Sequence, residues 1–129
     1  MLAVSSFDSC VELLKRTRSF LGKKLSAFEF MDAQAMSIHQ KAFKSQMPFE
    51  QMEQPYYLLV ELLGDETEVY TYVEEVGDLI EDGVVPRDEK QFDSLWFLRK
   101  GVASAAQELG HVFKTNTAVT SIDDYYGVV

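Results

Sequence analysis

The stretch LWFLRKGVASAAQELGHVFKTN, from Leu95 to Asn116, predicts a long helix and a strand that follows it. The helical period extends from about Asp88 to Leu109, and Gly110 is a typical residue for the helix end. From His111 to Val119 we expect a strand, in which Lys114 shares a face with Val112, Asn116 and Ala118 and lies opposite Phe113 and Val119. This helix and strand are the elements around which we interpret the rest of the chain.

One face of the predicted helix is apolar apart from a single cation, Arg99. The residues on this face are Phe92, Leu95, Trp96, Arg99, Ala103 and Ala106. Burying an unpaired charge costs several kcal/mol, so Arg99 needs a partner. An internal ion pair with a strand glutamate such as Glu29 or Glu61 is one solution, and a side chain that reaches past the face to water is another. A bound carboxylate is the third, because it matches the planar guanidinium in a bidentate contact.

Lys114 is a second candidate cation, in the strand after the helix. If Phe113 and Val119 meet the helices, Lys114 points to the uncovered face of the sheet. Glu29 and Glu61 can lie on that face too, where a cross-strand ion pair contributes about 0.2–1 kcal/mol. The alternative is that this face lines a binding site that another domain completes.

Strand and helix patterns alternate along the rest of the chain. A buried strand at Met1 to Val4 precedes a helix that Ser5 or Ser6 caps and Gly22 ends. The remaining predicted elements are a strand at 25–31, a helix at 33–43 capped by Asp32, a strand at 56–63, a helix with its inner face from Val69 to Ile80 that Gly83 closes, a short strand at 84–86, and a final helix capped by Ser121.

This order of elements predicts an α+β, ferredoxin-like fold with a mostly antiparallel sheet and helices packed on one face. A doubly wound parallel sheet is the alternative, but its strands are buried on both faces, whereas the strand glutamates imply a half-apolar face. No glycine-rich phosphate turn follows the first strand either. We expect the domain to be truncated at both ends, because the chain begins and stops within predicted elements.

The composition limits the possible partners and sites. A chain of 129 residues suits one domain, and a net charge of −9 disfavours nucleic acid or an anionic membrane as partner. No apolar run is long enough for a membrane span. Cys10 is the only cysteine, so we expect a buried, unreactive thiol. His39 and His111 lie far apart and outside any two-ligand motif, which predicts no metal site within the chain.

Three segments resemble one family in order and approximate spacing. They are LSAFEFMDAQAM (Leu25 to Met36), YYLLVELLG (Tyr56 to Gly64) and the 95–116 stretch. Together they resemble the C-terminal substrate domain of FAD-linked 2-hydroxy acid dehydrogenases, especially the D-2-hydroxyglutarate and D-lactate dehydrogenases. Some proteins of this kind have carried the label actin-interacting protein. The resemblance covers most of the chain, so we take residues 1–129 as one domain, part of the C-terminal substrate (cap) domain of a larger oxidoreductase.

The resemblance also implies site residues. The family pattern LW-x-x-R, followed by Y-K-Y-D, holds the substrate carboxylates, and Arg99 and Lys114 match its arginine and lysine. Two departures stand out: Ala103 replaces a threonine, and Thr115-Asn116 replace Tyr-Asp. No catalytic residue is implied in this chain. Arg99 and Lys114 would orient the substrate and would not abstract its proton.

The implied activity is oxidation of a D-2-hydroxy acid to a 2-oxo acid, with hydride transfer to FAD. An N-terminal FAD domain of the same parent chain would hold most of the cofactor, and a later segment would carry a divalent metal. The implied partners are therefore a small dicarboxylate or 2-hydroxy acid and that FAD domain. The implied location is mitochondrial, with the cytoplasm as the alternative, and this fragment alone is expected to be inactive. A stand-alone ferredoxin-like ligand-binding or protein-interaction module is the competing hypothesis.

Overall fold

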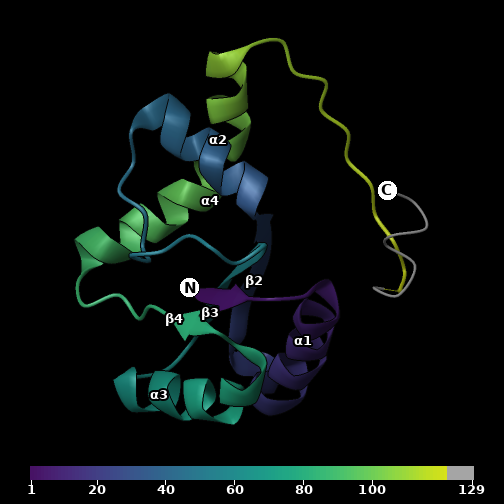
Figure 1. The fold of residues 1–129 in the computed structure, drawn as a ribbon. Helices are drawn as coiled ribbons and strands as arrows, with labels where there is room; N and C mark the ends of the chain where they lie inside the picture. Colours follow the sequence, from purple (N-terminus) through teal and green to yellow (C-terminus); the bar gives the residue numbers. More distant parts are fainter. Residues whose placement is uncertain (122–129) are drawn as a thin grey trace.

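A computed structural model, which describes residues 1–121, contains one four-stranded sheet with helices on both of its faces (Figure 1). The elements in chain order are β1 (Leu2–Val4), α1 (Phe7–Leu21), β2 (Leu25–Asp32), α2 (Ala33–Phe43), β3 (Tyr56–Leu62), α3 (Glu66–Glu75), β4 (Asp82–Gly83) and α4 (Glu89–Leu109), with 3₁₀ turns at Gly22–Lys24 and Gly77–Leu79. The strands have the order β2-β3-β1-β4, and all three neighbouring pairs are antiparallel.

This topology is ferredoxin-like, as the sequence predicts. The units β1-α1-β2 and β3-α3-β4 are two split βαβ crossovers, in which each helix joins strands that are separated by one antiparallel neighbour. The helix α2 is inserted between β2 and β3, and α4 follows β4. The α+β class and the antiparallel sheet are therefore confirmed.

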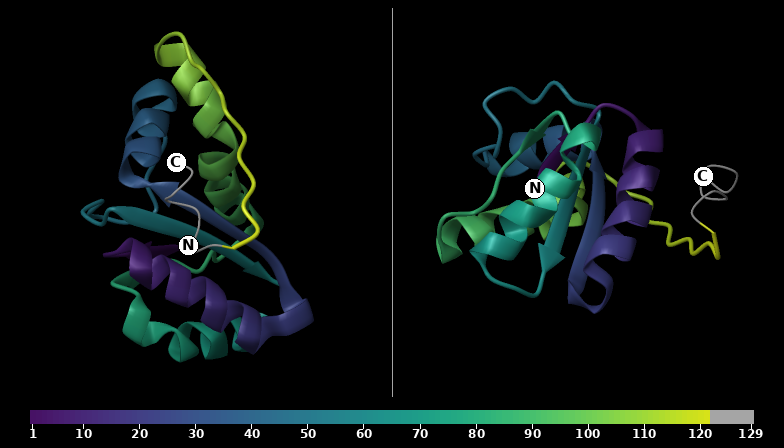
Figure 2. Two further views of the ribbon diagram at one scale, coloured as in Figure 1. Left: turned by 90° about the vertical axis from the view of Figure 1, so that its right-hand side faces the viewer. Right: turned by 90° about the horizontal axis from the view of Figure 1, so that it is seen from below.

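The helices occupy both faces of the sheet (Figure 2). On the first face α1 and α3 cover side chains such as Leu2, Val4 and Leu58. The sequence predicted that all the helices would pack on one such face. On the second face α2 and α4 cover side chains such as Tyr57 and Leu59. The difference from the prediction has a physical reason: successive residues of β3 are buried on opposite faces, so each face needs a cover.

Local capping signals fix most of the helix ends. Ser6 caps α1, Asp32 caps α2 and Asp88 caps α4, each by accepting a hydrogen bond from a backbone N–H in the first turn. Gly22 and Gly110 end α1 and α4. The Asp32 cap and the two glycine ends were predicted, and Ser6 was one of two predicted choices for the cap of α1. For α4 the sequence predicted a start near Asp88 but not its role as a cap.

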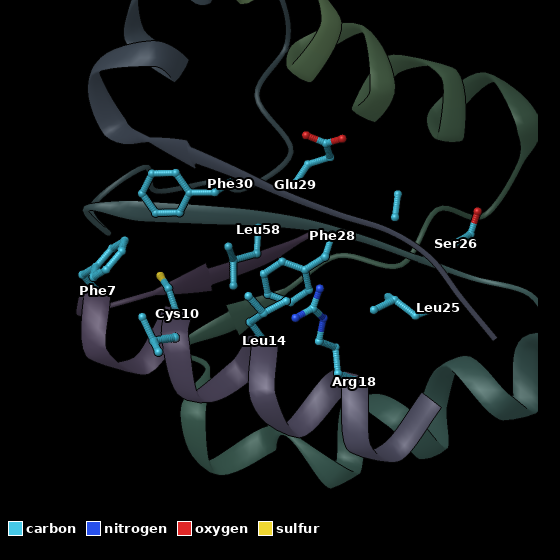
Figure 3. Close-up of a pocket in the computed structure, with 12 residues that line it drawn as sticks. Phe7, Cys10, Leu14, Arg18, Leu25, Ser26, Phe28, Glu29, Phe30 and Leu58 are labelled. Atoms are coloured by element: carbon cyan, nitrogen blue, oxygen red, sulfur yellow. The ribbon is translucent and has the colours of Figure 1, made fainter. Parts of the chain in front are cut away.

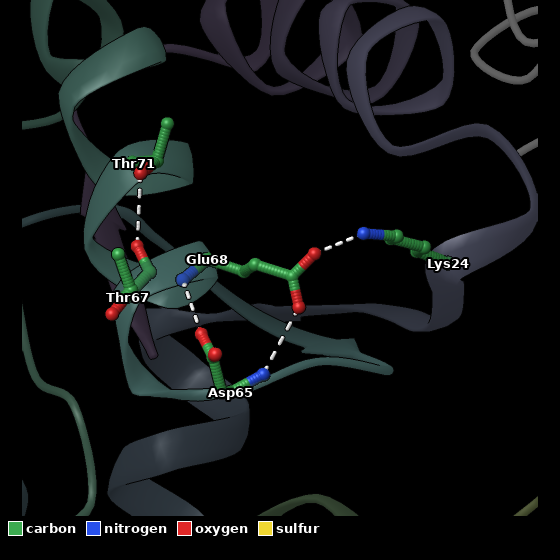
Figure 4. Close-up of polar contacts among 5 residues, drawn as sticks. All are labelled: Lys24, Asp65, Thr67, Glu68 and Thr71. Atoms are coloured by element: carbon green, nitrogen blue, oxygen red, sulfur yellow. Dashed lines mark hydrogen bonds and ion pairs between the residues drawn. The ribbon is translucent and has the colours of Figure 1, made fainter.

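The N-terminus of α3 carries a capping box that also ties the helix to the rest of the fold (Figure 4). The Asp65 side chain accepts from the Glu68 N–H at 3.0 Å, and the Glu68 carboxylate accepts from the Asp65 N–H at 3.0 Å. The other oxygen of Glu68 accepts from Lys24, which follows α1. These contacts lower the pKa of Glu68, the largest cause being the Lys24 hydrogen bond.

Three predicted features are wrong: the end of the third helix, the position of the short strand, and the strand after the long helix. The third helix ends at Glu75, before Gly83, because Val76 leaves the helical conformation and a 3₁₀ turn follows. The short strand lies at Asp82–Gly83, where Gly83 pairs with Leu2, and 84–86 is not part of it. The predicted strand from His111 to Val119 is not formed: a strand needs a hydrogen-bonded neighbour, and among residues 1–121 this segment pairs with none. The predicted final helix lies outside the described residues.

Candidate functional site

The helix α4 places Arg99 over the second face of the sheet. Its buried residues are Leu95, Leu98, Gly101 and Ala105. The predicted inward face was therefore correct for Leu95 but wrong for Ala103 and Phe92, which are exposed. The buried stripe is displaced because α4 packs against α2 along Gly101 as well as against the sheet. Arg99 lies at the margin of this stripe and is half-buried.

Arg99 forms an ion pair with Glu29 of β2. The distance between Arg99 Nε and Glu29 Oε2 is 2.6 Å, and the two side chains are 41% and 32% exposed. One of the predicted solutions, a strand glutamate, is thus the observed partner. Within residues 1–121 the contact uses Nε, and Nη1 and Nη2 donate no hydrogen bond. Because the pair is partly solvated, its contribution to stability is only about 0–1 kcal/mol.

A second carboxylate on the same face, Glu61 of β3, is held by two donors. Ser26 Oγ donates to Glu61 Oε1 at 2.7 Å, and Trp96 Nε1 of α4 donates to Glu61 Oε2 at 2.9 Å. The ammonium of Lys100 lies 5.0 Å from the Trp96 ring centroid, a cation–π distance. The sequence suggested Glu61 as a partner for Arg99 but not for Trp96. These bonds fix the rotation of α4 over the sheet, and with it the position of Arg99.

Lys114 lies apart from this cluster. It belongs to the exposed segment that follows Gly110, and within the described residues it makes no hydrogen bond or ion pair. The structure therefore places Arg99 beside Glu29 but does not bring Lys114 to them. Its role stays a prediction. Ala103, one turn after Arg99, is exposed.

The packing of α4 against α2 depends on His39, a residue for which the sequence predicted no role. The His39 side chain is fully buried; its Nε2 lies 3.1 Å from the Phe97 carbonyl and its Nδ1 lies 3.1 Å from Ser45 Oγ. Nε2 therefore donates to the carbonyl and Nδ1 accepts from the hydroxyl. Burial lowers the pKa of His39, although the Phe97 contact opposes the shift. The ring also packs edge-on against Phe43 and Phe97.

Gly101 makes this packing possible. A Cβ at position 101 would lie 2.4 Å from His39 Nε2, closer than van der Waals contact allows. A glycine inside an otherwise regular helical pattern was the available sequence signal for such a close approach.

The glycines and the potential metal ligands of residues 1–121 bear on whether this part of the chain could hold a cofactor or a metal ion. Within 1–121 the two glycines with positive φ, Gly22 and Gly110, end helices and do not open one, so they do not fit a phosphate cradle for a dinucleotide. No group of three His, Cys, Asp or Glu side chains in this part of the chain could hold a metal ion. The prediction that the chain lacks a metal site stays a prediction.

Two further predictions concern Cys10 and membrane spans. The prediction that Cys10 is buried is confirmed. Burial raises the pKa of its thiol to about 11, which disfavours the reactive thiolate. Among the helices of the described residues, none has the length and apolar character required to cross a bilayer.

Comparison with known proteins identifies the family. The family "FAD linked oxidases, C-terminal domain" matches residues 1–125. The mitochondrial D-2-hydroxyglutarate dehydrogenase of Danio rerio is 33% identical over 99% of this chain and 25% of the relative. A Schizosaccharomyces pombe protein, provisionally named a mitochondrial D-lactate dehydrogenase, is 35% identical over 83% of the chain and 22% of the relative. A D-2-hydroxyglutarate–pyruvate transhydrogenase of Saccharomyces cerevisiae is 29% identical over 97% of the chain and 26% of the relative.

The chain spans about a quarter of the length of these relatives. The match nevertheless covers nearly all of this chain, and it includes the sheet, the α4 helix and Arg99. The chain belongs to the family of FAD-linked oxidase C-terminal domains.

Proposed function

We propose that this chain is the substrate-holding part of a flavoprotein that oxidises a D-2-hydroxy acid to the 2-oxo acid. Arg99 and Lys114 would hold the substrate carboxylates. The proposal is supported by the family and by the relatives, whose names describe oxidation of D-2-hydroxyglutarate or D-lactate. The single observation that carries the site is the geometry of Arg99.

That geometry suits a carboxylate clamp. Glu29 holds the guanidinium through Nε at 2.6 Å, and a bidentate contact from Nη1 and Nη2 to a substrate carboxylate remains open. The hydrogen bond from Trp96 to Glu61 holds α4, the helix that carries Arg99, in place over the sheet. Arg99 is therefore pre-oriented, so little further side-chain entropy is lost when substrate binds. Glu29 also lowers the local net charge, which makes a second cation such as Lys114 necessary for tight binding of a dianion.

Substrate choice depends on the second carboxylate. A dicarboxylate such as 2-hydroxyglutarate needs two cationic contacts, whereas lactate needs one. Arg99 and Lys114 together favour the dicarboxylate, and Ala103 removes one hydroxyl that a family member would offer. FAD would be held mainly by another domain of the parent protein, where it supplies the hydride acceptor, and a divalent metal would belong to a further segment. The parent is proposed to be mitochondrial, as the names of its relatives state for those proteins.

The test uses the flavoprotein that contains this chain. Flavin bleaching is followed under anaerobic conditions with D-2-hydroxyglutarate and with D-lactate, in the wild type and in Arg99→Ala. Loss of a charge-assisted contact of about 1.5–3 kcal/mol predicts a fall in kcat/KM of roughly 10- to 150-fold for Arg99→Ala. Lys90→Ala is the matched control, because Lys90 is an exposed cation in the first turn of α4.

A purely structural ion pair makes a different prediction. In that case Arg99→Ala and Glu29→Ala lower the melting temperature to a similar extent, and kcat/KM stays at the wild-type value. Such a result removes Arg99 from the site. A colourless parent protein that contains no flavin would instead favour the stand-alone binding module.

A further inference from the structure

The hydroxyl group of Tyr57 in β3 is buried without a hydrogen-bond partner. The Tyr57 side chain is 0% exposed, and within residues 1–121 its oxygen is the one buried side-chain polar atom that forms no hydrogen bond. The groove between α1 and β2, which Cys10, Leu14 and Phe28 help to line, contains no such atom among its described residues (Figure 3). An unsatisfied buried donor costs free energy, so an added acceptor beside Tyr57 would be stabilising.

A cavity of about 220 Å³ lies beside Tyr57, between α2 and the segment of residues 44–55 that follows it. Three methionines line this cavity together with Tyr57: Met36 of α2, and Met47 and Met52 of the segment. No charged side chain is among the described residues that line it. The residue with the unsatisfied donor and three thioether side chains therefore share one uncharged cavity.

Solvent exposure divides the methionines of the chain into two groups. Met1, Met31 and Met36 are 6%, 3% and 1% exposed, whereas Met47 and Met52 are half-buried. Peroxides convert a methionine thioether to a sulfoxide, which is polar and accepts hydrogen bonds. Because the reagent must reach the sulfur, Met47 and Met52 are the methionines that we expect to oxidise first.

The path of the segment places Met52 at the Tyr57 end of the cavity. The Ala33 N–H donates to the Pro55 carbonyl at 2.9 Å, which ties the end of the segment to the first turn of α2. Burial raises the pKa of Tyr57, and the Gln54 backbone N–H opposes this rise, so it approaches the hydroxyl oxygen without forming a hydrogen bond. Met52 precedes Gln54 by two residues and is therefore the nearer of the two half-buried methionines along the chain.

Met47 belongs to the opposite end of the segment. Ser45, two residues before it, lies 3.1 Å from His39 in the second half of α2. The other polar side chains of the cavity are those of Ser37, which is half-buried, and Gln40, which is exposed. Both reach water, so a new hydrogen bond to either of them replaces one to solvent and adds little stability.

We propose that Met52 is a peroxide-dependent modification site whose sulfoxide oxygen accepts a hydrogen bond from the Tyr57 hydroxyl. A lone pair of the Met52 sulfur attacks one oxygen of hydrogen peroxide and the O–O bond breaks. The sulfur is oxidised by two electrons and keeps that oxygen, whose proton leaves with the second oxygen as water. The methionine side chain is unbranched and flexible, so it can turn the new S=O group toward the hydroxyl.

This contact reverses the usual effect of methionine oxidation. A sulfoxide within an apolar core is a polar group without a partner, and it disrupts packing. At this site the sulfoxide of Met52 supplies the acceptor that Tyr57 lacks, so each group satisfies the other. The rings of Phe49 and Tyr57 already lie 5.7 Å apart, and the new bond would hold the segment more firmly against β3.

The test compares two variants of the complete chain, each with one of the two half-buried methionines. Met47→Leu leaves Met52, and the matched control Met52→Leu leaves Met47, because leucine conserves the volume. Each is prepared with Tyr57 and with Tyr57→Phe, before and after treatment with hydrogen peroxide. Mass spectrometry verifies that one oxygen has been added to the remaining methionine of the segment, and circular dichroism gives the melting temperatures.

The expected result is a reversal of sign in the variant that keeps Met52. Before oxidation, Tyr57→Phe removes an unsatisfied donor and should raise the melting temperature by about 4 °C. After oxidation of Met52, the same substitution removes the partner of the sulfoxide and should lower the melting temperature by about 4 °C. In the control that keeps Met47, Tyr57→Phe should raise the melting temperature in both states.

Reduction of the oxidised wild-type chain provides the second measurement, because it keeps the Tyr57 hydroxyl. A methionine sulfoxide reductase with a thiol reductant should act about tenfold more slowly on the sulfoxide of Met52 than on that of Met47, since the bonded group must first open. If Tyr57→Phe fails to fold, these rates alone decide.

Three results would overturn the proposal: oxidation of Met52 as slow as that of Met36, an effect of Tyr57→Phe that oxidation leaves unchanged, or equal rates of reduction for the two sulfoxides. Neither measurement uses flavin or substrate, so the modification site and the proposed function can fail separately.

Discussion

The substitution Gly101→Ala tests the packing that positions α4, two residues beyond Arg99. In an exposed helix this change stabilises by about 1 kcal/mol, since alanine has the higher helix propensity. Here the added Cβ would lie 2.4 Å from His39 Nε2 and 2.9 Å from His39 Cδ2. The ring cannot simply swing away, because it is fully buried and hydrogen-bonded at both nitrogens.

The expected net effect is destabilising. Overpacking of a buried site costs about 1–3 kcal/mol. Displacing the ring also breaks the bond to the Phe97 carbonyl, and leaving a buried polar group unsatisfied costs about 1–3 kcal/mol. After the gain in propensity is subtracted, the free energy of unfolding should fall by about 1–5 kcal/mol. For a chain of this length each kcal/mol lowers the melting temperature by about 4 °C.

Thermal and urea unfolding followed by circular dichroism would measure this change. Ala103→Gly supplies the propensity scale at an exposed position of the same helix, and it should destabilise by about 1 kcal/mol. In a His39→Ala background the clash is absent, so Gly101→Ala should become stabilising. The reasoning is refuted if Gly101→Ala raises the melting temperature of the wild type, or if the His39→Ala background does not reverse its sign.

Two further predictions concern pH and capping. Burial lowers the pKa of His39 from its ordinary 6.5, so the folded chain binds fewer protons than the unfolded chain below that pH. The contribution of His39 to the free energy of unfolding should be fully present above about pH 6.5 and should be lost as the pH drops below it. Urea titrations at pH 5 to 8 should show a weaker dependence of this free energy on pH in His39→Gln than in the wild type. An unchanged dependence would assign it to other groups. Asp65→Ala removes the acceptor for the Glu68 N–H and should lower the free energy of unfolding by about 1 kcal/mol in urea melts. Asp65→Ser keeps an acceptor and should retain most of the wild-type stability. Equal losses in the two variants would contradict a capping role.

The sequence alone determined the elements whose signals are local. Asp32 and the period after it predicted α2 at Ala33–Phe43, and Asp88 with Gly110 bounded α4. A cap or a turn of helix involves residues within about four positions of one another, so these interactions can be identified without knowledge of the fold. The alternation in Leu25–Met31 and the nearly continuous apolar run of Tyr56–Leu63 predicted the two long strands, again from neighbouring residues alone. The ferredoxin-like order then followed from the succession of elements.

Only the tertiary structure decided the partners of the polar groups. Trp96 meets Glu61 across 35 residues of sequence, His39 meets Phe97 across 58, and Arg99 meets Glu29 across 70. No local period encodes such pairs. They depend on which edge of the sheet a helix crosses and how it rotates about its axis.

The segment after α4 illustrates the same division. The sequence predicts a strand from His111 to Val119, but hydrogen bonding to a neighbouring chain segment is what makes an extended chain a strand. The sequence could specify which residues of this segment share a face. Whether the segment has a neighbour to pair with is decided by the tertiary structure, because a strand is completed by backbone groups that its own residues do not supply.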